Sequence, residues 1–247
     1  RSPMMNRVLN IDAFGAIANS TSDAAVLNNS LALTKALAAA QSGDTVLVAK
    51  DKRYTFRGSI AAANLTNVAI RFEGRLAVDD DISKWPGILN KKRLPFLDLQ
   101  NCANVTLSGG GAIDGQGKNW WDASITGSVP GLGESRPDLL HVTDSRDVLL
   151  EDLTLYDSPH FHVRFSQCIN VEVRRIKIDV DRFAQREVKA KAHANRLTRH
   201  GFMANTSAAL DFTRRLYHRS QHADDWRDWL LDQAVKLLPA WALQPED

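Results

Sequence analysis

Apolar and polar residues alternate with a period of two over much of the first 180 positions, and the alternation recurs as a repeated unit. In each of four segments, an apolar residue stands seven positions before Asn or Asp; Val follows, then another apolar residue two positions further on. The four segments begin at Ile60, Leu97, Leu140 and Val163. Period-two alternation predicts strands with one buried face.

The repeat predicts an all-β fold for residues 1–180, in which consecutive coils stack as a single-stranded parallel β-helix. The last two units are 23 residues apart, measured from Asp147 to Asn170, and the earlier spacings are longer. The additional residues fall in loop-like stretches around Trp85 and Trp120. Each coil buries its inward residues only against its neighbours, so the fold needs several coils and covered ends.

The segment before the first repeat has helical periodicity. Gly43 follows it as a stop signal. The apolar positions predicted to share one helical face are Leu31, Leu33, Ala36, Leu37 and Ala40. Residues 44–49 then alternate as a first strand. We expect the helix to cap the first coil, whose backbone edge would otherwise be exposed.

Residues 181–247 differ in character from the repeats, and we predict a divergent, mostly helical tail there. Its basic run lacks interleaved aromatic residues or a known motif, so we expect no nucleic-acid partner. An apolar stripe at helical spacing predicts a final amphipathic helix, formed by Trp226, Trp229, Leu230, Ala234, Leu237, Leu238 and Trp241. The open end of the β-helix and a partner protein are alternative docking surfaces for this stripe, and the third possibility is no stable docking.

The two cysteines occupy the same position of their repeats. Ser145 takes that position in the coil between Cys102 and Cys168. Stacked strands are about 4.8 Å apart, so the two Cα atoms should be roughly 9–10 Å apart. A disulfide needs a separation below about 7 Å, and we therefore predict two free, inward-facing thiols.

Composition changes this picture little. The chain is 44% hydrophobic and 24% charged, with a formal net charge of +2, as in an ordinary globular protein. No long apolar run predicts a membrane span, and the first ten residues contain no apolar signal region. The histidines show no compact metal-ligand spacing, so we expect neither a metal ion nor a cofactor.

Several short motifs lie within or between the repeats. They are DAFGA at residues 12–16, GDTV at 43–46, IDGQGKNWW at 113–121, Arg136-Pro137, and Ser158-Pro159 preceding His162. The third resembles the I-D-G-x-G-x-x-W-W motif of the polygalacturonase family of glycoside hydrolases, family 28. DAFGA, Arg136-Pro137 and Ser158-Pro159 with His162 are similar to the family's D-x-F-G-A, R-P and S-P-x-x-H motifs, and GDTV follows the first of them along the chain. The resemblance covers residues from about 8 to 180 and implies a right-handed, pectin-lyase-like β-helix.

The resemblance also implies hydrolysis of α-1,4-linked galacturonan with inversion. Such hydrolysis needs a carboxylic acid and a carboxylate base about 6.5–9.5 Å apart. The family supplies them from N-T-D and D-D motifs on coils that would follow Asp179, but the strand pattern stops there. Arg175-Ile176-Lys177 spells the family's R-I-K motif in the wrong order along the chain. We assign no catalytic residue and expect the chain to be truncated before the catalytic carboxylates and inactive.

His162 starts the coil before the one expected to carry N-T-D. We predict that His162 contacts a galacturonate carboxylate or hydroxyl group, joined by His160 and Arg164. The alternative is an exposed histidine on a strand, without a ligand.

Three functional hypotheses remain open. The chain is a polygalacturonase-type hydrolase by family, a non-catalytic β-helix that binds pectin-like polysaccharide or a partner protein, or a truncated product without function. We expect a monomer. Five N-x-[ST] sites favour a secreted, glycosylated protein, although Asn and Thr are also common in β-helix turns: Asn19, Asn28, Asn64, Asn104 and Asn205.

Overall fold

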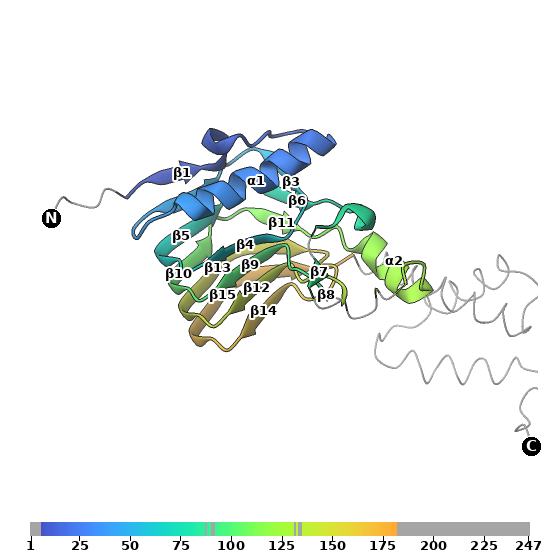
Figure 1. Ribbon diagram of the computed structural model, residues 1–247. Helices are drawn as coiled ribbons and strands as arrows, with labels where there is room; N and C mark the ends of the chain where they lie inside the picture. The colour runs from blue at the N-terminus through green and yellow to red at the C-terminus, as the bar shows by residue number, and fades with distance from the viewer. Residues whose placement is uncertain (1–5, 87, 90–91, 131, 133–134, 182–247) are drawn as a thin grey trace, which may run out of the picture. The chain divides into compact units, whose positions relative to one another are not determined.

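The computed structural model describes residues 6–86, 88–89, 92–130, 132 and 135–181, and these form a right-handed parallel β-helix (Figure 1). Three strand ladders run along its sides. The first joins β1 (Val8–Asn10), β2 (Thr45–Val48), β5 (Thr66–Phe72) and β10 (Ala103–Ser108). The second joins β3 (Arg53–Phe56), β6 (Arg75–Val78) and β11 (Ala112–Asp114).

Two long strands, β13 (Arg146–Tyr156) and β15 (Ile169–Asp179), link these two ladders. Each bends at a residue with positive φ, Asp152 at 52° and Arg175 at 52°. The third ladder is a separate four-stranded sheet. It consists of β4 (Ile60–Ala63), β9 (Leu97–Gln100), β12 (Leu140–Thr143) and β14 (Val163–Ser166).

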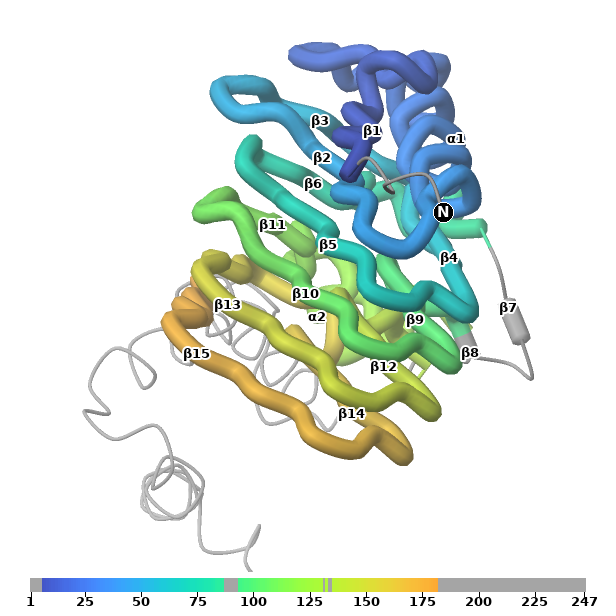
Figure 2. Tube along the Cα trace, turned by 90° about the vertical axis from the view of Figure 1, so that its left-hand side faces the viewer, coloured from blue at the N-terminus to red at the C-terminus, as the bar shows by residue number. Residues whose placement is uncertain are grey.

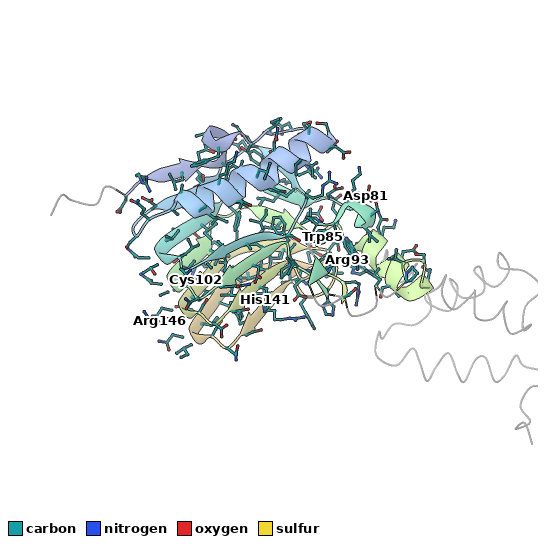
Figure 3. The ribbon with its side chains drawn as sticks, viewed as in Figure 1. Asp81, Trp85, Arg93, Cys102, His141 and Arg146 are labelled. Carbon is teal, nitrogen blue, oxygen red and sulfur yellow. The ribbon has the colours of Figure 1, made fainter. Side chains whose placement is uncertain are left out.

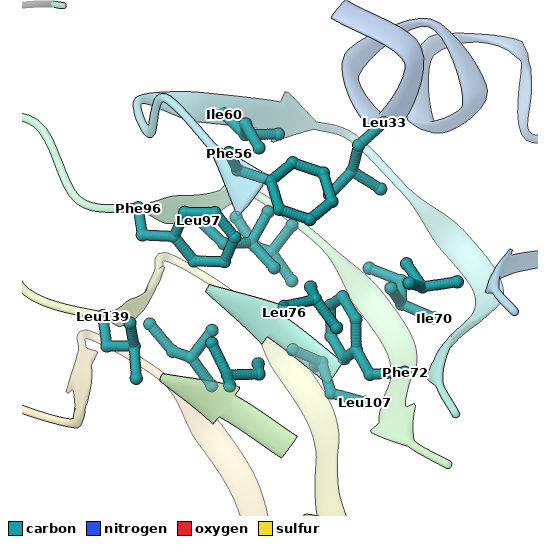
Figure 4. Close-up of a cluster of buried hydrophobic side chains, with 14 of the residues drawn as sticks. Leu33, Phe56, Ile60, Ile70, Phe72, Leu76, Phe96, Leu97, Leu107 and Leu139 are labelled. Atoms are coloured by element: carbon teal, nitrogen blue, oxygen red, sulfur yellow. The ribbon is translucent and has the colours of Figure 1, made fainter. Parts of the chain in front are cut away.

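The predicted repeat is confirmed by the strand register. Val105 pairs with Val68 on one side and Val148 on the other, and Val148 pairs in turn with Val171. The successive coils lie directly above one another in Figure 2, from β5 through β10 and β13 to β15. The core is built from equivalent positions: Figure 4 shows Ile70, Phe72 and Leu107 packed beside Leu76.

Asparagine side chains form ladders from coil to coil at the turn between the third ladder and the first. Asn104 has a φ of 52°, and its Nδ2 donates to Asn67 Oδ1 over 2.9 Å. Asn101 donates in the same way to Asn64, over 2.6 Å. Asn tolerates the left-handed backbone conformation better than most residues, so the turn and the ladder both favour it. Asn therefore recurs at this turn in successive coils.

Substitutions of Asn104 can separate the effect of its positive φ from the effect of its ladder hydrogen bond. We expect Asn104→Ala to lower the free energy of unfolding by about 1–2 kcal/mol, because it loses the ladder bond and strains the backbone. Asn104→Gly loses only the bond and should cost less than about 1 kcal/mol. Urea unfolding curves of both variants give the comparison. Equal losses would show that the positive φ is not the cause.

The predicted capping helix is α1 (Asp23–Ala39), which covers the first coil (Figure 1). Ser22 Oγ accepts from the amide of Ala25 at its N-terminus. Leu31 was predicted on the buried face but is 45% exposed, because it points away from Leu33 around the helix. The residues of α1 that are buried are Ala25, Val26, Asn29, Ser30, Ala32, Leu33, Ala36 and Leu37.

The stretches around Trp85 and Trp120 contain more regular structure than predicted. The first holds a 3-10 turn, η2 (Ile82–Lys84), and the short pair β7 (Ile88–Leu89) and β8 (Lys92–Arg93). The second folds as α2 (Lys118–Thr126), where a loop was expected. A further 3-10 turn, η1 (Ile11–Phe14), follows β1.

Both cysteines are free thiols, as predicted. Cys102 is buried, and its amide donates to Ser145 Oγ over 2.9 Å. Burial raises the pKa of the Cys102 thiol. Cys168 is half-buried and packs against the core.

Within the described part of the chain, β15 has no strand beyond it. Its apolar side chains are therefore exposed, Val173 by 51% and Ile178 by 55%. The predicted helical tail lies outside the described residues beyond Asp181. No helix among the described residues is long and apolar enough to cross a membrane.

Candidate functional site

Polar side chains gather on the outer face of the β4-β9-β12-β14 sheet. Asp98, His141 and Arg164 are paired in register on three successive strands. The next outward position along each strand is also polar, with Gln100, Thr143 and Ser166. Figure 3 places His141 on this sheet. Because residues two apart share one face of a strand, this set forms one continuous polar surface, which we call the outer sheet face.

Asp138, just before β12, contacts three residues at one end of this face. Its carboxylate is 6% exposed and contacts Arg164 Nε at 3.0 Å through Oδ2. Its other oxygen, Oδ1, lies 3.0 Å from His160 Nδ1 and accepts from the amide of Phe161 over 3.3 Å. The structure thus brings two of the three predicted site residues, His160 and Arg164, together on one buried carboxylate.

Phe161 presents an aromatic ring at the same place. Phe161 is 51% exposed, and it is the one aromatic residue among the exposed large hydrophobic residues of the described chain. The Arg164 guanidinium carbon lies 4.9 Å from its centroid, and the His160 ring lies 4.1 Å away. Phe161 is therefore fixed in orientation while much of its surface remains open to solvent.

A second network runs across the middle of the outer sheet face. His141 Nε2 lies 3.0 Å from Ser166 Oγ and 3.1 Å from Thr143 Oγ1. His141 Nδ1 faces Asp98 Oδ1 at 3.6 Å, which is longer than a hydrogen bond. Asp98 Oδ2 accepts from Gln100 Nε2 over 2.7 Å, whereas Oδ1 is buried without a hydrogen-bond partner. Because that oxygen is buried, it is not exposed to a ligand on the sheet face.

His162 lies apart from these networks. The amide of Leu140 donates to the His162 carbonyl, so His162 precedes the paired Val163 and stands level with the buried Leu139. Its Nε2 accepts from the amide of Ser158 over 3.3 Å. Burial lowers the pKa of His162 because the imidazolium form loses hydration. The side chain is thus half-buried and supports the Ser158-Pro159 turn, in contrast to the exposed strand histidine of the alternative hypothesis.

The lowered pKa predicts a pH dependence of stability. The unfolded chain binds the His162 proton more tightly than the folded chain, whose pKa lies below the ordinary value of 6.5. The stabilising contribution is therefore complete above pH 6.5 and is lost as the pH falls through the folded pKa. Urea unfolding between pH 7.5 and 5 should show a flatter dependence for His162→Asn than for the parent chain. Identical slopes would contradict this assignment.

The outer sheet face was only partly predicted. Asp138, Phe161, Asp98 and His141 were missed, although the repeat itself held a signal for two of them. Asp98, His141 and Arg164 each directly follow the first apolar residue of their repeat. Stacking the repeats therefore places them side by side. Among the described residues, no group of three His, Cys, Asp or Glu side chains is arranged to hold a metal ion.

The stacked coils form a parallel β-helix, and polar side chains line the outer face of its β4-β9-β12-β14 sheet. The family model described as "Glycosyl hydrolases family 28" matches residues 40–189, and the chain belongs to that family. A polygalacturonase of Persea americana is 28% identical over 165 residues, which are 66% of this chain and 34% of the relative. A polygalacturonase of Chamaecyparis obtusa is 26% identical over 71% of this chain and 33% of the relative. The chain thus spans about a third of the length of these curated relatives.

Solved structures share the fold. The polygalacturonase from Erwinia carotovora ssp. carotovora matches with a TM-score of 0.57 and 20% identity, covering 75% of this chain and 51% of that structure. The endo-xylogalacturonan hydrolase from Aspergillus tubingensis matches with a TM-score of 0.58 and 24% identity, covering 70% and 43%. The predicted right-handed, pectin-lyase-like β-helix is confirmed.

Proposed function

We propose that this chain provides the first coils of a polygalacturonase-type hydrolase, and that its outer sheet face binds galacturonan. The observation that carries the proposal is the convergence of His160, Phe161 and Arg164 on Asp138 in a member of glycosyl hydrolases family 28. The relatives named polygalacturonase suggest the polymer. By the same analogy, we propose that the chain is extracellular, and we expect it to be monomeric.

The chemistry of the face suits an acidic sugar. Arg164 uses Nε and one terminal nitrogen on Asp138 and is 36% exposed, so part of its planar donor set remains open to a substrate carboxylate. The exposed Phe161 ring offers an apolar surface to the C–H face of a sugar ring. Ser166 and Thr143 carry hydroxyl groups that can form hydrogen bonds with sugar hydroxyl groups.

We further propose that the 247-residue chain binds galacturonan without cleaving it. The carboxylates on the described part of this face are Asp98 and Asp138. Asp138 is enclosed by Arg164 and His160, and Asp98 is 7% exposed beside His141 and Gln100. Neither is free to protonate a leaving oxygen or to activate water, as inverting hydrolysis requires. Non-catalytic binding of a partner protein, in place of a polysaccharide, is the alternative for the chain as a whole.

A binding titration tests the proposed face. Calorimetry with an oligogalacturonate should show saturable binding that Arg164→Ala weakens about tenfold, because a charge-assisted contact contributes about 1.5–3 kcal/mol. Arg146→Ala is the matched control, since it removes the same charge from an exposed position outside the face. Equal losses in both variants would point to diffuse charge attraction and would contradict the proposal.

Phe161 gives a separate prediction. Phe161→Ala should weaken oligogalacturonate binding about five- to tenfold, whereas Phe161→Tyr should bind as the parent does, because the ring surface is kept. Ile125→Ala, a change at another exposed apolar side chain, should have no effect. Parent-like affinity of Phe161→Ala would show that the ring does not touch the polymer.

A further inference from the structure

A hollow of about 220 Å³ lies on a different side of the β-helix, over β6, β11 and β13. Its polar lining residues are Arg53, Arg75, Asp114, Tyr156 and Asp157. Asp114 lies in register with Tyr156 on the neighbouring strand. None of the lining residues belongs to the β4-β9-β12-β14 sheet. At ~30 Å³ for each water, the hollow has the volume of roughly seven water molecules, which suits one monosaccharide better than an oligomer.

The two arginines are neighbours in register. Arg53 pairs with Arg75 across β3 and β6, so their Cα atoms are about 4.8 Å apart. Neither guanidinium forms an ion pair or a hydrogen bond with another described residue. Like charges directly opposite on paired strands are destabilising. Other arginines on the described coils are neutralised by carboxylates: Arg57, Arg71, Arg174 and Arg175.

The next coil leaves space beside this pair. Ala112 follows Arg75 in register on β11, and Thr154 follows Ala112 on β13. Ala112 forms part of the lining. Its side chain is short, so it leaves open the space that a long side chain at this position of the coil would fill. An anion in the hollow would lie beside Arg75 and relieve the repulsion between the two guanidinium groups.

The other polar residues of the lining are acidic or phenolic. Burial raises the pKa of Asp157, and the neighbouring carboxylates of Asp114, Asp181 and Asp179 raise it further. Asp157 Oδ1 accepts from the amide of Asp181 over 2.7 Å, and the Tyr156 side chain lies beside it in the lining. These oxygens are hydrogen-bond partners for hydroxyl groups. The lining thus combines two guanidinium groups with the carboxylates of Asp114 and Asp157 and the hydroxyl group of Tyr156.

We propose that this hollow binds a single sugar acid, with its carboxylate on Arg53 and Arg75 and its hydroxyl groups toward Tyr156 and Asp157. The site is separate from the outer sheet face and does not depend on the function proposed for that face. A monomeric uronic acid has the required chemistry, with one carboxylate and several hydroxyl groups on a compact ring.

Titration with D-galacturonate, followed through the amide NMR signals of the full chain, tests the site residue by residue. Arg75 and Ala112 should shift saturably, and D-galactose should bind at least about tenfold more weakly because it lacks the carboxylate. Equal affinity for galactose, tighter binding of inorganic phosphate, or shifts confined to the outer sheet face would overturn the proposal. Shifts at Arg75 without shifts at Arg164 would support this site even if the outer sheet face binds nothing.

Two variants address the mechanism. Arg75→Ala should weaken galacturonate binding at least about tenfold. Ala112→Met should do the same without changing charge, because it fills the hollow, and it keeps the proposal testable if Arg75→Ala folds poorly. Arg146→Ala is the control and should change affinity less than about twofold. Retained binding in Ala112→Met, or an equal loss in the control, would refute the site.

Discussion

The Trp120→Ala variant is expected to lose about 3–5 kcal/mol of unfolding free energy, the range for removing a buried aromatic side chain. Trp120 is fully buried, and its ring meets Trp85 edge-on at a centroid distance of 5.2 Å. Arg93 lies 5.5 Å from the Trp120 ring centroid, and Figure 3 shows Trp85 and Arg93 close together. The substitution leaves a large cavity between two long insertions and the coils beneath them.

Urea unfolding measures this loss directly. Ile125→Ala on the same helix is the control, because Ile125 is 40% exposed and surface changes seldom exceed about 0.5 kcal/mol. Trp121→Phe is a second comparison. It removes the Nε1 bond to the Ser158 carbonyl, 3.0 Å long, but keeps most of the ring, so it should cost about 1 kcal/mol. A loss below about 1 kcal/mol for Trp120→Ala would show that α2 is not anchored through this ring.

The second large effect is expected at Asp138. Asp138→Asn should weaken oligogalacturonate binding about tenfold or more, because Arg164 and His160 lose the carboxylate that orients them. The amide is nearly isosteric and its oxygen can still accept from Phe161. The fold should therefore survive, although removing one partner of a buried pair lowers stability.

Asp138 is proposed to act by orienting Arg164 and His160. A test of this role must therefore separate lost orientation from lost stability. In the Arg164→Ala background, Asp138→Asn should cause little further loss of affinity, because the group it positions is already gone. Asp152→Asn removes the same charge from an exposed pair with Arg175 and should leave binding unchanged. Additive losses from Asp138→Asn and Arg164→Ala would mean that Asp138 does not work through Arg164.

The coil architecture could be predicted because it depends on the local alternation of apolar and polar residues. Alternation around Val68, Val105 and Val148 sets both the buried face and the register, and one repeat specifies the next. The predicted helix before it was correct in kind, but Leu31 was placed on the wrong face. Its neighbours Ser30 and Asn29 are buried instead, through hydrogen bonds that apolar periodicity cannot show.

The binding face was harder to predict because its key contacts join Asp138 to residues of the following coil. Asp138 lies outside the repeated unit, so no pattern connects it with His160 or Arg164 before the coils are stacked. His162 was correctly placed at the start of the last described coil. Its motif gave no indication that the side chain would be half-buried or that its Nε2 would accept a hydrogen bond from the Ser158 amide. Its predicted role in substrate binding stays a prediction.

The most direct test of the central claim is a paired assay on polygalacturonic acid with the purified 247-residue chain. Release of reducing ends and retention of the chain on the polymer are measured in the same samples. We predict saturable retention that Arg164→Ala weakens, with no release of reducing ends above a heat-inactivated control. Release that co-purifies with the chain, or no retention at all, would contradict the account.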